Sequence, residues 1–304
     1  MKHSLAITLI LVGVFFVSQL VGLAVIGQYV AQRTVNETTG EVNITYAGLP
    51  LDMQRPEIEA NQSYIFILGA VLIGTILVLL LIKFKGFKLW KMWFFLSVAL
   101  CLTISFYAFT RKLFPDTVPT FIPSGVALVL AVTLATLKIY KPNFIIHNAS
   151  EVFIYGGLAA IFVPIMNLFA IVILLILISV YDMIAVWQSK HMVKMAQFQT
   201  ESKVFAGLSI PYEIPKKQEK TEGKNLKTVQ VKSAILGGGD IGFPLLFAGV
   251  LMKTAGYLKV LVVPIAVSVA LFLLLYFAKK DRFYPAMPFI TAGCFVGYGI
   301  LMLL

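Results

Sequence analysis

Long runs of apolar residues divide this chain, and they restrict its fold more than any other feature. A helix needs about 20 consecutive, mainly apolar residues to cross the hydrocarbon core of a bilayer. Such runs recur along all 304 residues, of which 59% are hydrophobic and only 13% are charged. This composition lies far from that of a soluble domain. We therefore expect an all-α protein that crosses the membrane several times.

Nine of the runs are long enough to form membrane-spanning helices. They are Leu5 to Ile26, Tyr64 to Ile82, Trp90 to Phe109, Phe121 to Ile139, Phe144 to Val163, Pro164 to Gln188, Ser233 to Met252, Tyr257 to Phe277 and Pro285 to Leu304. The first run is longer than the apolar part of a signal peptide, so we expect it to be retained. The sequence thus predicts six helices in residues 1–188, a loop over residues 189–232 and three helices in residues 233–304.

The basic residues predict how these helices are oriented. Lys and Arg are enriched in the cytoplasmic loops of membrane proteins. If the N-terminus is cytoplasmic, 19 of the 25 Lys and Arg residues lie inside, and the six outside are Arg33, Arg55, Arg111, Lys112, Lys253 and Lys259. An odd number of spans places the C-terminus outside. The polar stretch from Gln28 to Ser63, which has glycosylation sequons at Asn36, Asn43 and Asn61, then becomes an external loop.

Two carboxylates remain inside the apolar runs. An aspartate at the centre of a membrane helix costs about 2.5–3.5 kcal/mol on insertion scales, so it is expected to be functional and to have a partner. Of the 14 acidic residues, 11 lie in or beside polar loops and Glu151 lies close to the start of a run, which leaves Asp182 and Asp240. Measured from predicted helix ends at Gln188 and Ser233, both carboxylates lie about 10 Å from the inner boundary. We therefore expect Asp182 and Asp240 to meet.

Glycines and prolines lie close to both acids in the predicted fold. The glycines from Gly237 to Gly239 directly precede Asp240, and small residues let helix backbones approach closely. Pro244 removes the helical hydrogen bond to the carbonyl group of Asp240. The segment Tyr284 to Pro288 follows a basic inner segment and therefore lies on the same side as the acids. Helix packing would explain the glycines and helix initiation the prolines, but neither explains Asp240.

Three short motifs in these runs together resemble a known family. Tyr181-Asp182 lies in the sixth run, Gly237-x-Gly239-Asp240 in the seventh, and Pro285-Ala286-Met287-Pro288 in the ninth. In this order the whole chain resembles the presenilin and signal peptide peptidase family of GxGD intramembrane aspartyl proteases. The Tyr-Asp motif and the proline-rich motif are more similar to the presenilin branch, including its microbial homologues. The family's Pro-Ala-Leu reads Pro-Ala-Met here, a change that conserves volume and apolarity.

The resemblance implies a presenilin-like fold of nine helices and an aspartic-type endopeptidase that cleaves membrane proteins. Asp182 and Asp240 would be the catalytic pair. The resemblance further implies that the site is shaped by Tyr181, Gly237, Gly238 and Gly239, and that the substrate is seated by Pro285, Ala286, Met287 and Pro288. Two neighbouring carboxylates cannot both ionise cheaply, so the pair is expected to share one proton and to activate a water molecule.

The expected partners are membrane-protein substrates and the lipid bilayer, with no metal and no cofactor. The net charge of +11 suits anionic lipid headgroups rather than nucleic acid, because the basic residues lie in short loops between apolar runs. Exposed apolar helices are compatible with a homo-oligomer. The sequence leaves open whether accessory subunits are needed and whether the 189–232 loop is self-cleaved.

The main alternative function is a proton- or cation-coupled transporter or channel, because paired intramembrane acids beside broken helices also bind ions. That function predicts inverted repeats and acids near the midplane. No convincing repeat is visible, and both acids lie toward the inner side. A serine protease has less support, since no serine pairs with a histidine inside the runs, and a purely structural membrane protein has the least.

The predicted cytoplasmic loop contains an apolar stretch, Val204 to Pro215, that is too short to span the membrane. It either dips toward the membrane, offers an extended edge for strand addition or belongs to a solvated linker. The residues alone do not decide among these three.

Overall fold

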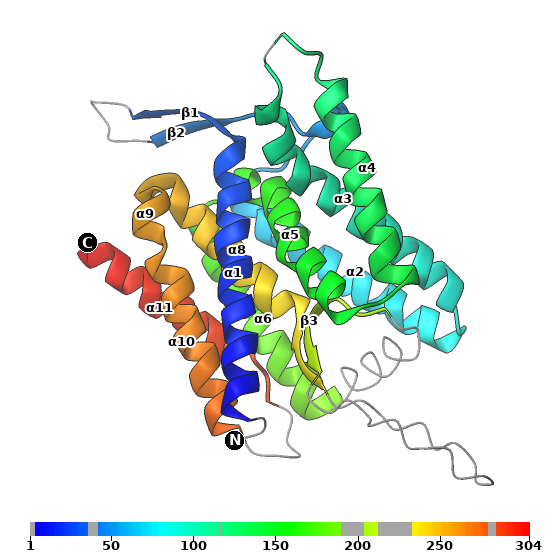
Figure 1. The fold of residues 1–304 in the computed structure, drawn as a ribbon. Coiled ribbons are helices and arrows are strands. Elements are labelled where there is room, and N and C mark those ends of the chain that lie inside the picture. The colour runs from blue at the N-terminus through cyan, green and yellow to red at the C-terminus, as the bar shows by residue number, and fades with distance from the viewer. Residues whose placement is uncertain (1–3, 36–41, 116, 190–203, 212–232, 279–283) are drawn as a thin grey trace, which may run out of the picture.

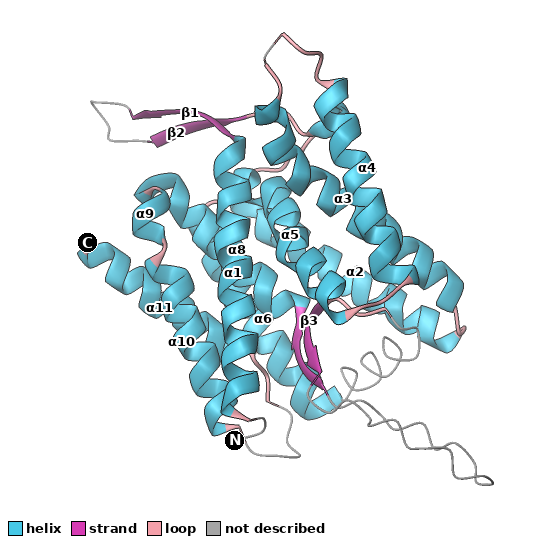
Figure 2. Ribbon diagram, viewed as in Figure 1, coloured by secondary structure: helices cyan, strands magenta, loops and turns pink. Residues whose placement is uncertain are grey.

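The computed structural model describes residues 4–35, 42–115, 117–189, 204–211, 233–278 and 284–304, and this part of the chain is mainly helical (Figure 1; Figure 2). The α-helices are α1 (Leu5–Tyr29), α2 (Ser63–Lys83), α3 (Phe87–Leu113), α4 (Phe121–Tyr140), α5 (Phe144–Phe162), α6 (Leu168–Ile184), α8 (Gly238–Ala255), α9 (Tyr257–Val260), α10 (Val262–Phe277) and α11 (Met287–Leu303). Two short antiparallel sheets pair β1 (Val30–Val35) with β2 (Val42–Tyr46) and β3 (Gly207–Pro211) with β4 (Ser233–Gly237).

The number of helical segments agrees with the sequence prediction. Seven segments in the described residues are long and apolar enough to cross a membrane, with α9 and α10 counted as one segment. Helices α8 and α11 bring the segments to the predicted nine. The join at Pro164 is a turn of 3-10 helix over Val163–Ile165, after which α6 begins at Leu168.

The predicted start of the seventh helix is wrong. Residues Ser233–Gly237 form strand β4, and helix α8 begins only at Gly238. A short apolar run that ends in glycines does not distinguish a strand from a helix by its periodicity. The correction moves Asp240 from the interior of a helix to its first turn.

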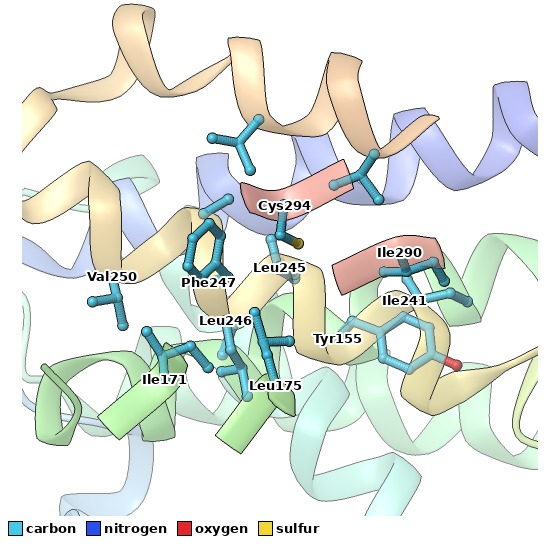
Figure 3. Close-up of a cluster of buried hydrophobic side chains, with 14 of the residues drawn as sticks. Tyr155, Ile171, Leu175, Ile241, Leu245, Leu246, Phe247, Val250, Ile290 and Cys294 are labelled. Atoms are coloured by element: carbon cyan, nitrogen blue, oxygen red, sulfur yellow. The ribbon is translucent and has the colours of Figure 1, made fainter. Parts of the chain in front are cut away.

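Helix α8 is central to the bundle, in contact with α1, α5, α6, α10 and α11 (Figure 1). Every residue from Pro244 to Met252 is buried, as expected for a helix that is apolar on all sides. Figure 3 shows its side chains packed among those of the neighbouring helices, including Tyr155, Leu175 and Cys294. The fixed position of α8 in this core holds its first turn, which carries Asp240, in one place.

Helix α2, by contrast, is only loosely packed. It contacts α3 and α6, and among its residues only Ser63 and Ile67 are buried. Most of its apolar side chains are therefore available to lipid, as expected for a peripheral membrane helix.

The β1–β2 hairpin lies at the end of the bundle opposite the start of α1 (Figure 1). Three basic residues at this end bind carbonyl groups where helices finish, which carry partial negative charge. The Arg33 guanidinium donates to the Thr254 carbonyl at 2.6 Å, Arg55 Nε to the Ala160 carbonyl at 3.2 Å and Lys253 Nζ to the Met166 carbonyl at 2.6 Å. All three belong to the group predicted to lie outside. The sequon at Asn36 lies outside the described residues.

Close packing between α3 and α5 gives a test of this fold. A Cβ atom added to Gly157 would lie 1.9 Å from the carbonyl oxygen of Cys101. Gly157→Ala should therefore push the two helices apart and lower the apparent melting temperature in detergent by about 5 °C or more. Gly125→Ala is the control, because a Cβ at this helical glycine meets nothing within 4 Å. Equal melting temperatures for the two variants would contradict this packing.

Candidate active site

Asp182 lies in the last turn of α6, directly before the π-helical turn Ala185–Ser189. Its Oδ2 atom accepts a hydrogen bond from the backbone N–H of Met287 at 3.1 Å, and the N–H of Ala286 is a second donor. Met287 is the first residue of α11, and the first N–H groups of a helix have no partner within it. The Asp182 carboxylate therefore caps the start of α11 and connects it to the end of α6.

Asp240 is the third residue of α8, and Gly237 is the N-cap. The Asp240 carboxylate accepts a hydrogen bond from the backbone N–H of Gly237. A side chain at the third position that binds the N-cap N–H is half of a capping box. The helix start also carries partial positive charge, which favours an acidic side chain. The fold thus supplies local partners for an acid that would be costly inside a helix.

The two carboxyl groups lie close enough for the charge of Asp182 to act on Asp240. Both Asp182 and Asp240 are partly buried, so each keeps some access to the surface. One acid comes from the end of α6 and the other from the start of α8, and Asp182 is also bonded to the start of α11. The three predicted motifs, which contain Asp182, Asp240 and Met287, therefore lie at one site.

The other predicted site residues lie in two places: the proline-rich motif lies next to Asp182, and the Tyr181 hydroxyl group lies against helix α2. Pro285 and Met287 are buried next to Asp182, and Pro288 occupies the first turn of α11, where a proline costs no helical hydrogen bond. Tyr181 lies differently. Its hydroxyl oxygen is 3.2 Å from Thr75 Oγ1 on α2, so that hydroxyl group contacts α2.

The sequence analysis missed Tyr155, which lies beside the glycines that precede Asp240. A Cβ atom on Gly238 would be 2.8 Å from the Tyr155 hydroxyl oxygen, and that hydroxyl group interacts electrostatically with Asp240. The hydroxyl group donates a hydrogen bond to Glu151. Tyrosines are common in apolar runs, so the sequence contains no signal that separates Tyr155 from an ordinary core residue.

The sequence analysis also gave Glu151 no role because it lies near a predicted helix start, and this was wrong. Glu151 is only 1% exposed, and its Oε1 atom is 2.5 Å from Nζ of Lys138 on α4. His147, on the same helix as Glu151, has a partner as well, since its Nε2 atom is 2.8 Å from the carbonyl oxygen of Gly207. The sequence does contain a signal for the contact between Lys138 and Glu151. Lys138 lies inside the fourth apolar run, and a charged residue there needs a partner.

Strand β4 runs directly into Gly237 and Asp240, and it pairs with β3 from the predicted loop. The register sets Gly207 opposite Gly237 and Ser209 opposite Ile235. Of the three alternatives for the Val204 to Pro215 stretch, the extended one is therefore found for residues 207–211. Residues 212–215 lie outside the described part of the chain, as does most of the 189–232 loop.

A family model described as signal-peptide peptidase, presenilin aspartyl protease matches residues 41–304. The chain belongs to this family. The protease is accordingly an aspartic-type intramembrane endopeptidase and a multi-pass membrane protein. The comparisons give no support to the transporter alternative.

Two solved structures share the fold of the protease. Both are described as structures of a presenilin family intramembrane aspartate protease, one in space group C222 and the other in P2. The first has a TM-score of 0.63 and covers 97% of this chain and 98% of that chain; the second has a TM-score of 0.61 and covers 98% and 97%. Each is 17% identical in sequence. None of the curated proteins compared with the protease matches it.

The contact between Gly238 and Tyr155 generates a prediction for the protease. Gly238→Ala should displace the tyrosine or the first turn of α8 and lower kcat by about tenfold or more, since small displacements of reacting groups are costly. Adding Tyr155→Phe to this variant should restore part of the activity, because the hydroxyl oxygen makes the closest contact.

The control for this series is Gly242→Ala on the same helix, where a Cβ atom would lie at an ordinary 3.7 Å from the Tyr155 ring. Cleavage of a single-span membrane substrate and the melting temperature are measured for each variant. If Gly238→Ala is as active as Gly242→Ala, the close contact has no catalytic importance.

Proposed function

We propose that Asp182 and Asp240 are the catalytic pair of an endopeptidase that hydrolyses peptide bonds within or near the transmembrane helices of its substrates. The observation that supports this most directly is that the two carboxyl groups lie close enough for the charge of Asp182 to act on Asp240. Backbone N–H groups of Met287 and Gly237 hold one carboxylate each. Such fixed donors keep reacting groups in position before the substrate arrives.

In the proposed mechanism the two acids share one proton, since like charges held close together do not ionise independently. The ionised carboxylate removes a proton from a water molecule held between the pair. The protonated carboxyl group donates a hydrogen bond to the scissile carbonyl group, and the water oxygen adds to the carbonyl carbon. The resulting gem-diol collapses with transfer of a proton to the leaving amine. No covalent bond to the enzyme forms.

The substrate segment has to be extended at the cut, because a helix hides its carbonyl groups and bare backbone is costly in lipid. Both the N–H and the C=O of Ser209 bond to Asn148, so the pair Ser209 and Ile235 is not a hydrogen-bonded pair of the ladder. The backbone groups of Ile235 therefore face away from β3. We assign the substrate segment to this edge of β4, by strand addition next to Asp240.

The same geometry supports a cytoplasmic position for the site. The end of α6 and the β3–β4 sheet lie on the side of the bundle where α1 begins, opposite the β1–β2 hairpin (Figure 1), and the start of α8 lies deeper, where the Ile241 carbonyl accepts a hydrogen bond from Gln19 of α1. With the N-terminus cytoplasmic, as the basic residues predict, cleavage occurs near the cytoplasmic face and the C-terminus is external.

The catalytic pair is tested with Asp182→Asn and Asp240→Asn in the purified protein, using a generic single-span membrane substrate. Each variant should lose activity by about 100-fold or more, because general acid–base catalysis requires both groups. Asn keeps an acceptor oxygen for the backbone N–H groups, so the melting temperature should not fall. Asp52→Asn, at an exposed residue, is the matched control. A variant of either acid with more than a tenth of wild-type activity would exclude that acid from the pair.

The proposed binding of the substrate along the β4 edge is tested with Ile235→Pro. This change removes one outward-facing N–H group and leaves the hydrogen bonds between β4 and β3 intact. The expected result is a rise in KM of about tenfold with the same melting temperature. Ile235→Val keeps the N–H group and should behave as wild type. An unchanged KM for Ile235→Pro would show that the substrate does not bind along this edge.

A further inference from the structure

The second edge of the β3–β4 sheet is occupied by side chains of α5. Asn148 Nδ2 donates to the Ser209 carbonyl at 2.8 Å, and the Ser209 N–H donates to Asn148 Oδ1 at 3.0 Å. A neighbouring strand would use the same two backbone groups. Asn148 is 8% exposed, so this pair of bonds is largely protected from water. The amide side chain thus takes the place of a third strand.

Gly207, the first residue of β3, is held in the same manner. Its N–H donates to Glu151 Oε2 at 3.1 Å, and its carbonyl oxygen lies 2.8 Å from His147 Nε2. The residue has φ of +132°, and a Cβ atom would lie 2.1 Å from the Leu236 carbonyl oxygen of β4. Only glycine fits this conformation and this close approach. Two of the three outward-facing residues of β3, Gly207 and Ser209, are therefore bound by α5, and the third, Pro211, has no N–H group.

A buried ion pair supports these contacts from behind. Lys138 and Glu151 are 4% and 1% exposed, and Lys138 Nζ is also 3.2 Å from His147 Nδ1. A buried ion pair is weak evidence for stability, because the desolvation of both charges offsets their attraction. A positioning role accounts for the pair better, because Lys138 binds one carboxylate oxygen and leaves Oε2 for Gly207 and Tyr155.

We propose that Asn148, His147 and Glu151 form an edge clamp that pre-forms the β3–β4 sheet before the substrate binds. The clamp occupies the β3 edge, so that among the described residues the β4 edge is the one left to accept an extended segment. Through the pairing of Gly207 with Gly237 it also positions the residue whose N–H binds Asp240. These three are positioning residues, since they act on the substrate and on the acid through the strands. The effect on substrate binding rests on the proposed function, whereas the pre-formed sheet does not.

The clamp is tested with Asn148→Ala, which removes both bonds to Ser209. Without them the substrate has to order β3 when it binds, so KM should rise about tenfold while kcat changes less than threefold. Hydrogen exchange of the amides in residues 204–211, measured without substrate, should become faster. Asn143→Ala is the matched control: Asn143 lies on the same side of the bundle and its Oδ1 caps α5 by accepting from the Ile145 N–H at 3.0 Å, without touching β3.

A merely structural role for Asn148 predicts a different result. Both asparagine variants would then lose stability to a similar extent, with no change in KM and no selective change in exchange at residues 204–211. That result would overturn the clamp.

A second comparison separates hydrogen bonding from charge. Lys138→Met with Glu151→Gln, and Lys138→Met with Glu151→Leu, both remove the ion pair, but only Gln keeps an acceptor for the Gly207 N–H. The clamp predicts slow exchange at residues 204–211 and a near wild-type KM for the Gln variant, with fast exchange and a raised KM for the Leu variant. Identical behaviour of the two would show that Glu151 does not act through Gly207.

The exchange measurements need no catalysis, so the clamp can fail while the protease proposal survives, and the reverse also holds. Faster exchange in Asn148→Ala together with active Asp182→Asn and Asp240→Asn variants would support the clamp and reject the catalytic pair. Unchanged exchange and unchanged KM, with both aspartate variants inactive, would reject the clamp alone.

Discussion

A peptide backbone inside a membrane has to keep its hydrogen bonds, and this constraint shapes the whole site. Helices satisfy it along their length but leave free N–H groups at their starts. The fold places two such starts, those of α8 and α11, beside the two acids, so that Gly237 provides a donor for Asp240 and Met287 a donor for Asp182. The acids in turn cap the starts of α8 and α11. Carboxylates that would be expensive in lipid are thereby accommodated at backbone positions that need acceptors.

The β3–β4 sheet meets the same constraint differently at its two edges. An open strand edge is normally avoided in proteins because it invites pairing with other chains. Along β3 the outward-facing backbone N–H and C=O groups are bound by Asn148, Glu151 and His147. Along β4 the backbone groups of Ile235 face away from the sheet. A protease that receives an unwound helix needs one such edge. In the proposed mode of binding, the occupied β3 edge and the β4 edge together give the incoming segment a single direction of approach.

The sequence was sufficient for the features that follow from solvation. Apolar runs predicted nine helical segments, and the cost of buried charge selected Asp182 and Asp240. The sequence was insufficient where a short segment fits both a strand and a helix, and where a contact depends on how two helices pack. The five residues of β4 are mainly apolar, as those of a membrane helix would be, and pairing with β3, across a long separation in sequence, makes them a strand. Lys138 and Glu151 lie in different runs, and their pairing depends on how α4 and α5 pack.

The two capping acids also imply a conflict between stability and activity. Asp182 and Asp240 each accept backbone N–H groups, a task that a neutral amide oxygen performs as well. Bringing two acids within range of each other's charge has no structural benefit, since it opposes the packing of α6 against α8. A chain selected only for folding would carry asparagine at both positions. In the proposed mechanism the two aspartates therefore mark a place where this sequence gives up stability for chemistry, as functional sites in other proteins commonly do.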